Sequence, residues 1–105
     1  MANISKEKAL EIWAKKFGNL EYAKDKAGAW IIRDKYGDTT PLGYGWEIDH
    51  KVPTSHYGSD LDENLRPLQW ENNRSKSDNY PEWTSVVTSQ GERNIYKNQS
   101  WVFKK

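Results

Sequence analysis

The chain has 105 residues, which is enough for one small domain but too short to enclose two separate apolar cores. It carries 16 Lys and Arg against 15 Asp and Glu, a formal net charge of +1. A domain that bound nucleic acid through charge alone would show a strong positive excess. We therefore expect a single domain over 1–105, and any contact with nucleic acid is expected to be local or assisted by a metal.

The residue composition excludes several further classes of protein. Without cysteine, the chain has neither disulfides nor a thiolate zinc site to hold a small domain together. Six Trp, six Tyr and two Phe favour a small aromatic core and are untypical of a disordered chain. No apolar stretch approaches the roughly 20 residues that span a bilayer, and residues 1–10 lack the apolar core of a secretory signal. We expect a cytoplasmic protein with no membrane partner.

The first predicted element is an amphipathic helix near the start of the chain. Apolar residues recur at spacings of three and four from Ala9 to Phe17. Ser5 is placed to cap the start of this helix, and Gly18 is placed to end it. The apolar stripe predicts packing against the core and not a ligand site.

A turn, a strand, a loop and a second strand are expected next. The stretch 25–28 favours a turn, and the bulky and branched residues of 29–32 favour a strand. Residues 39–45 contain one proline and two glycines and are typical of a loop. Residues 46–50 alternate apolar and polar side chains, as a half-buried strand does.

The second half of the chain is expected to form a loop, a strand, a short helix and a hairpin. The loop covers 53–62, and the strand and the short helix lie within 65–78. Apolar pairs at 86–87 and 95–96 flank a turn at 89–92, which is the pattern of a β-hairpin. Together the elements predict an α+β fold.

Asp49 and His50 end the strand at 46–50 and form the first candidate pair for catalysis. Regular alternation would send the two side chains apart, whereas a bulge or turn would bring both to one pocket. A carboxylate holds a hard divalent cation through oxygen, and a neutral imidazole takes a proton from water as a general base. Alone, the pair is a weak signal, since an Asp-His dipeptide is more often a surface coincidence than a site.

Two further polar motifs follow in order. Asn64 comes fourteen residues after His50, and an N-x-x-K sequence from Asn73 to Lys76 begins nine residues after Asn64. The set resembles the HNH nuclease family over 47–78, in the subclass that has Asn in place of His at the third motif position. The order and spacing of these residues make the resemblance fairly specific.

The resemblance implies an endonuclease that hydrolyses phosphodiester bonds in DNA. It implies a ββα-metal finger with its core at 46–79, flanked by the N-terminal helix and the C-terminal hairpin. Asp49 and Asn73 would bind one divalent cation, magnesium or manganese, and His50 would activate the attacking water. Asn64 would hold the loop, because an amide both donates and accepts and can bridge backbone groups across a hairpin.

The charged residues around Asn73 receive further roles from the same resemblance. Lys76 and Arg74 are expected beside the metal on the short helix, in contact with the scissile phosphate or its neighbours, with ordinary surface charges as the alternative. Glu71 is a candidate for a further or water-mediated ligand, or else a solvated charge. His56 fits a solvated or capping role better than catalysis and is left out of the site.

The sequence also departs from the family and leaves other functions open. Many HNH proteins bind a structural zinc through two pairs of cysteines, which this chain lacks, so Trp46, Trp70 and the flanking helix must brace the motif. Residues 1–44 resemble no family that would indicate a target. One alternative is a non-catalytic module that keeps the ββα shape and binds nucleic acid or protein. Another is a toxin-like nuclease that cuts RNA or any DNA.

Overall fold

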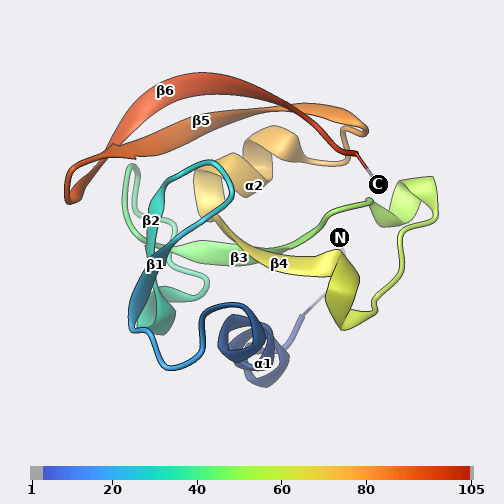
Figure 1. The fold of residues 1–105 in the computed structure, drawn as a ribbon, viewed down its shortest axis with the longest axis horizontal. Coiled ribbons are helices and arrows are strands. Elements are labelled where there is room, and N and C mark those ends of the chain that lie inside the picture. Colours follow the sequence, from blue (N-terminus) through green and yellow to red (C-terminus); the bar gives the residue numbers. More distant parts are fainter. Residues whose placement is uncertain (1–3, 105) are drawn as a thin grey trace.

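The computed structural model describes residues 4–104 and contains, within that range, two α-helices and three two-stranded antiparallel sheets. The helices are α1 (Lys6–Phe17) and α2 (Trp70–Lys76). The strands are β1 (Tyr22–Lys24), β2 (Trp30–Ile32), β3 (Trp46–His50), β4 (Leu65–Gln69), β5 (Glu82–Gln90) and β6 (Arg93–Val102). They pair as β1–β2, β3–β4 and β5–β6, an α+β fold as the sequence predicted (Figure 1). Neither helix in the described part of the chain is long and apolar enough to cross a membrane.

The helix α1 has the ends that the sequence predicted. The Ser5 side chain accepts a hydrogen bond from Lys8 N at 3.1 Å, which satisfies one of the free N–H groups of the first turn. Gly18 ends the helix at φ 62°, and its N–H donates to Ala14 O at 2.8 Å. The buried side of the helix presents Trp13 to the core.

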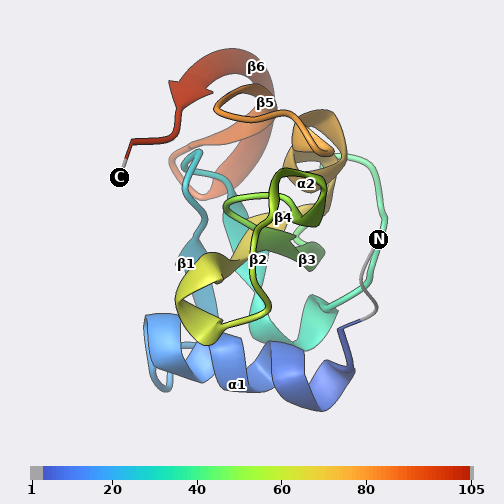
Figure 2. The same cartoon turned by 90° about the vertical axis from the view of Figure 1, so that its right-hand side faces the viewer.

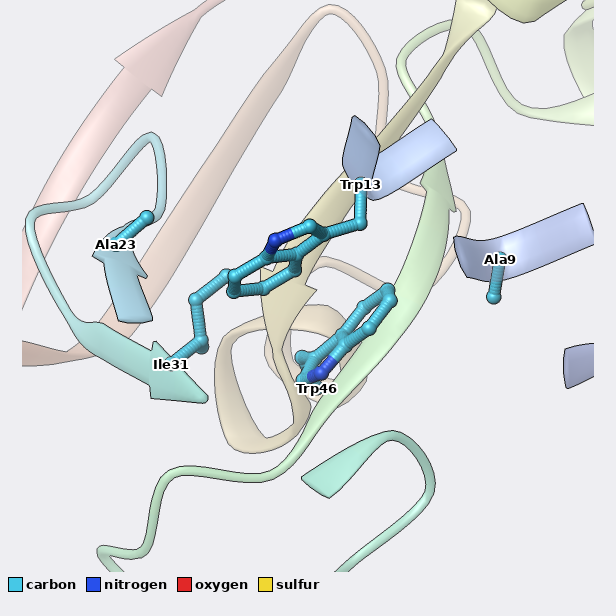
Figure 3. Packing of buried hydrophobic residues seen from close by; sticks show 5 residues of the cluster. All are labelled: Ala9, Trp13, Ala23, Ile31 and Trp46. Carbon is cyan, nitrogen blue, oxygen red and sulfur yellow. The ribbon is translucent and has the colours of Figure 1, made fainter. Parts of the chain in front are cut away.

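The core is built on two tryptophans that lie far apart in the sequence. The ring centroids of Trp13 and Trp46 are 5.0 Å apart, and Ala9, Ala23 and Ile31 complete the cluster (Figure 3). Both indole N–H groups donate to backbone carbonyls, so neither buried donor is left unpaired. Because Trp46 is the first residue of β3, the core fixes the start of the strand that ends at His50. The bracing role predicted for Trp46 is confirmed.

The segments β3, β4 and α2 form a continuous β–β–α unit. In the β3–β4 register Trp46 pairs with Gln69 and His50 pairs with Leu65, with no irregularity between them. Gln69 caps α2, accepting hydrogen bonds from two N–H groups of the first turn. Figures 1 and 2 show α1 at one end of the molecule and the β5–β6 hairpin at the other. The helix α2 lies between that hairpin and the β3–β4 sheet (Figure 1).

A buried polar network ties α2 to the two neighbouring hairpins. Oδ2 of Asp25 accepts from Gln69 N at 2.9 Å and from Asn72 Nδ2 at 3.1 Å, and its Oδ1 accepts two further N–H groups of its own turn. Oδ1 of Asn72 accepts from the N–H groups of Val86 and Val87, each at 2.8 Å. Burial raises the pKa of the Asp25 carboxyl above its ordinary value, and the four donors oppose that rise.

The C-terminal hairpin is longer than the sequence pattern indicated. It was expected around the turn at 89–92, and the paired strands extend from Glu82 to Val102 with a register shift between Ser85 and Val87. The sequence also did not predict β1, which pairs with the expected strand β2. The strand β1 is short, and the additional parts of β5 and β6 are polar. Their strand pairing depends on partners elsewhere in the chain, so the local sequence pattern does not indicate it.

Candidate functional site

The strand β3 sends Asp49 and His50 to opposite faces. Asp49 pairs with Arg66 and His50 pairs with Leu65 in regular register, so the bulge that would bring both side chains to one pocket is absent between these residues. The side chain of Asp49 is 3% exposed, whereas that of His50 is 13% exposed. Of the two expectations, simple alternation is the correct one.

His50 and Asn73 line the same pocket. This pocket has a volume of about 310 Å³ and is formed by β3, the loop that follows it and the C-terminal end of α2. Ser77 and Asp78 add polar groups at the end of α2, and Asp49 does not contribute to the lining. The structure therefore brings together two of the four central residues that the sequence predicted.

Asp60 holds the imidazole of His50. Nε2 of His50 lies 2.7 Å from Oδ1 of Asp60, whose side chain is 74% exposed. An ionised carboxylate only accepts hydrogen bonds, so the proton of a neutral imidazole lies on Nε2 and Nδ1 is the basic nitrogen. No role was predicted for Asp60, because the path of a ten-residue loop has no periodic signal in the sequence.

Asn64 closes the loop that carries Asp60. Its Nδ2 donates to Val52 O at 3.0 Å and to Ser59 O at 2.7 Å, and its Oδ1 accepts from Val52 N at 2.9 Å. Its own backbone carbonyl accepts from Lys51 N at 2.8 Å. The amide thus bridges both ends of the loop directly after His50, which is the arrangement that the sequence predicted for Asn64.

Asp49 is enclosed between two cations. Nε of Arg66 donates to its Oδ2 at 2.8 Å, and Nζ of Lys76 lies 3.0 Å from its Oδ1. Nζ of Lys76 also donates to the carbonyl of His50 at 3.0 Å, and the Lys76 side chain is 1% exposed. A buried carboxylate requires such compensation, because an unpaired charge in the interior is strongly unfavourable.

This arrangement corrects the position expected for Lys76. The family resemblance favoured a contact between Lys76 and phosphate, with a surface charge as the alternative, but the ammonium is buried and engaged by Asp49 and by the carbonyl of His50. The N-x-x-K spacing places the lysine one turn after Asn73, on the side of α2 that meets β3. To reach a phosphate, Lys76 would have to break both interactions.

Glu47 connects Asn73 and Arg74 to β3. Its Oε1 accepts from Asn73 Nδ2 at 2.9 Å, and its Oε2 accepts from Arg74 Nη2 at 2.9 Å. The hydrogen bond with Glu47 raises the pKa of Arg74, which also lies over the Trp70 ring at 5.4 Å. The amide nitrogen of Asn73 is thus in use, and its oxygen is the atom available to a ligand. No site role was predicted for Glu47, since a carboxylate beside an isoleucine is the ordinary alternation of polar and apolar residues in a strand.

Glu71 and His56 lie outside the pocket. Glu71 accepts from Leu42 N at 2.7 Å and from the Tyr96 hydroxyl at 2.8 Å, so both of its oxygens anchor other segments. Its candidacy as a metal ligand is not supported by this position. His56 is exposed, and its ring lies 5.4 Å from that of Tyr80.

No group of three or more His, Cys, Asp or Glu side chains within residues 4–104 is arranged to hold a metal ion. Comparison with models of protein families, with curated proteins and with solved structures gave no match to this chain. The case for function therefore depends on the geometry around His50 and Asn73 and on the resemblance of the motifs.

Proposed function

We propose that the chain is a metal-dependent endonuclease of the HNH type that hydrolyses phosphodiester bonds in DNA. The observation that supports this most is the convergence of His50, from the end of β3, and Asn73, from α2, on one pocket. The order β3, β4, α2 is the order that a ββα-metal finger requires. This order of elements supports the proposal.

His50 is the proton acceptor in this proposal. With its Nε2 proton held by Asp60, the imidazole has Nδ1 available to take a proton from water. The Asp60 carboxylate then stabilises the imidazolium that forms. Asn64 keeps Asp60 and His50 in register by fixing both ends of the loop between them. General base catalysis of this kind contributes about 10² to 10⁴ in rate.

The cofactor of the proposed enzyme is a hard divalent cation, and the side chains between β3 and α2 carry the oxygen atoms that such a cation prefers. Glu47 and Asp49 both contact residues of α2 from β3, and with the amide oxygen of Asn73 they would offer a cation oxygen donors and no sulfur. Such a set suits magnesium or manganese and not zinc. When bound, the cation would supply positive charge that stabilises the transferring phosphoryl group and the leaving oxygen.

Asp49 joins that set only if Lys76 releases it. The carboxylate is balanced by Arg66 and Lys76, so a cation at Asp49 would compete with the ammonium for the same oxygen. Glu47, whose side chain is 20% exposed, is more accessible to an incoming ion. The proposal therefore assigns Asn73 and one of these two carboxylates as ligands, and it does not use Lys76 as a phosphate contact.

One observation favours a second candidate function, a non-catalytic binding module of the same shape. A carboxylate held by two buried cations is typical of a structural ion pair, and in such a module Asp49 would never bind a metal. The two functions differ in their dependence on metal, because a binding module needs none for contact with nucleic acid.

Nicking of supercoiled plasmid DNA distinguishes the two functions. The protein is incubated with Mg²⁺, Mn²⁺ or EDTA, and His50→Ala is compared with His56→Ala, an exposed histidine outside the pocket. We expect nicking by the wild type and by His56→Ala only with metal, and none by His50→Ala. Binding of DNA without nicking under any of these conditions would support the binding module. Parallel reactions with single-stranded RNA identify a nuclease that acts on RNA.

A further inference from the structure

A second cleft, of about 480 Å³, lies on a different part of the molecule from the His50 pocket. Its walls come from the end of α1, the end of β1 and its turn, β4, and the open end of the β5–β6 hairpin. Among the described residues the two cavities share no lining residue. Figure 2 shows β1 and the segment after β6 on the same side of the molecule. None of the residues to which the HNH resemblance assigns a role lines this cleft.

The cleft gathers positive charge in a chain that is nearly neutral overall. Six cationic residues line it, against the single carboxylate of Asp25. The cations are Lys16, Lys24, Lys26, Lys51, Arg66 and Lys104. Within residues 4–104 Arg66 is paired with Asp49, and none of the five lysines forms an ion pair. The carboxylate of Asp25 is buried and accepts four hydrogen bonds from the protein, so it offers little to balance them.

The cations of the cleft act on one another. Lys16, Lys51 and Arg66 line the same cleft, so their like charges repel one another. An anion in the cleft would relieve this repulsion. The local positive field thus favours a ligand with several negative charges.

Aromatic side chains form the other part of the walls. Trp83 and Trp101 stack with ring centroids 6.1 Å apart, and Phe17 and Phe103 also line the cleft. Nζ of Lys26 lies 5.0 Å from the Trp101 ring centroid. The guanidinium of Arg66 lies 5.5 Å from the Trp83 ring centroid. These contacts hold cations beside flat apolar surfaces.

We propose that this cleft binds a strand of nucleic acid, with its phosphates on the lysines and its sugars and bases against the aromatic walls. Grooves that combine cations along a backbone with aromatic faces are characteristic of single-strand binding. Lys51 follows His50 directly in the chain, so a strand held here lies next to the end of β3. The choice of nucleic acid among polyanions rests on the proposed function. Because the net charge of the chain is only +1, any contact with nucleic acid is expected to be local, and this cleft would provide such a contact.

Binding without cleavage tests the cleft separately from the nuclease. A labelled single-stranded oligodeoxynucleotide, the matching duplex and labelled polyglutamate are titrated in EDTA, and anisotropy is recorded at several salt concentrations. The cleft variant is Lys16→Gln/Lys26→Gln/Lys51→Gln. Its control is Lys6→Gln/Lys35→Gln/Lys97→Gln, which removes the same charge from exposed lysines outside the cleft.

We expect the cleft variant to bind the single strand at least tenfold more weakly than wild type. The slope of log affinity against log salt should fall by about 2 to 3, because three phosphate contacts are lost. The control variant should stay within about twofold of wild type. If the cleft variant also binds the duplex about tenfold more weakly than wild type does, the cleft contacts the strand within a duplex as well.

Equal weakening by the two triple variants would overturn the proposal, as would wild-type affinity in the cleft variant. Binding of polyglutamate as tight as that of the oligonucleotide would assign the cleft to acidic protein partners instead. The outcome is independent of the nuclease proposal. A protein that binds through the cleft but never nicks DNA would retain this site and lose the proposed activity.

Discussion

Nζ of Lys76 lies 3.0 Å from Oδ1 of Asp49, and the two side chains are only 1% and 3% exposed. The pair joins α2 to β3, and Asp49 is one of the two ligands that the HNH resemblance assigns to one cation. In this arrangement the ammonium supplies the charge balance that a metal ion would otherwise give to Asp49. In the proposed enzyme, Lys76 and the metal would therefore compete for one carboxylate, and this competition would have measurable consequences.

Replacing Lys76 with methionine should have opposite effects on stability and on metal response. In EDTA, Lys76→Met should lower the free energy of unfolding by about 3 kcal/mol, because Asp49 loses a buried partner. In Mg²⁺, the melting temperature should rise more for the variant than for wild type, because Asp49 is freer to bind the ion. Thermal unfolding in EDTA and in Mg²⁺ measures both, with Lys97→Met as the exposed control. An equal Mg²⁺ response in all three proteins would remove Asp49 from the ligand set.

Asp60→Ala should reduce nicking by about tenfold, near the low end for removing a group that orients a catalytic histidine. The carboxylate fixes the proton of His50 on Nε2, and without it the two neutral tautomers compete. Single-turnover nicking gives the rate, and the ¹⁵N shifts of the ring give the tautomer. Asp34→Ala, at an exposed site in the turn after β2, serves as control. An unchanged rate together with an unchanged tautomer would show that Asp60 does not act on His50 in solution.

Asp25→Asn should destabilise the fold by about 2 to 4 kcal/mol, although the two side chains have almost the same size. Oδ2 of Asp25 now accepts hydrogen bonds from Gln69 N and Asn72 Nδ2. An amide NH₂ in the place of that oxygen would face these two donors and accept neither. Asn72 is unable to turn its amide in response, since its Oδ1 already accepts two N–H groups of β5. Urea unfolding measures the loss, and a variant as stable as wild type would contradict this description of the network.

The acid sensitivity of the fold should depend in part on Asp62. Hydrogen bonds from Lys15 and Lys8 hold the pKa of the Asp62 carboxyl below its ordinary value. A carboxyl with a lowered folded pKa stabilises the protein above its unfolded pKa of about 3.9, and this stabilisation is lost as the pH falls through the folded pKa. Asp62→Asn should therefore be less stable than wild type at pH 6, and the difference should shrink on acidification below about pH 4. Urea unfolding from pH 6 to pH 3 measures this, and a constant difference would exclude titration of Asp62 as its cause.

The local elements were predictable because their signals lie within a few residues. The spacing from Ala9 to Phe17 gave α1, and its capping residues gave both ends. Alternation from Trp46 to His50 gave β3, and it also gave the correct faces for the two last side chains. The bridging role of Asn64 was predicted from the family resemblance, and the chemistry of an amide agrees with it.

The charge pairs of the site were not predictable in the same way. Asp60 meets His50 across a ten-residue separation, and Lys76 meets Asp49 across twenty-seven, and no periodicity in the sequence reports such contacts. The lysines of the cleft come from α1, from β1 and its turn, from the chain after β3 and from the chain after β6, so their common position depends on the packing of four separate segments. The net charge of the chain does not indicate this cluster of lysines, because the acidic residues that balance them lie elsewhere on the molecule.

Chemical rescue examines the role of His50 as the proton acceptor. His50→Ala shortens the side chain where the imidazole stood and leaves Asp60 and Asn64 in place, so free imidazole can be supplied from solution. The measurement is the rate of plasmid nicking in Mg²⁺ by His50→Ala with increasing imidazole, beside His56→Ala at the same concentrations. We predict a rate below about 1% of wild type without imidazole, which fits the 10² to 10⁴ of general base catalysis, and a rise with imidazole in His50→Ala alone. Nicking by His50→Ala at the wild-type rate, with or without imidazole, would contradict the assignment of His50 as the base.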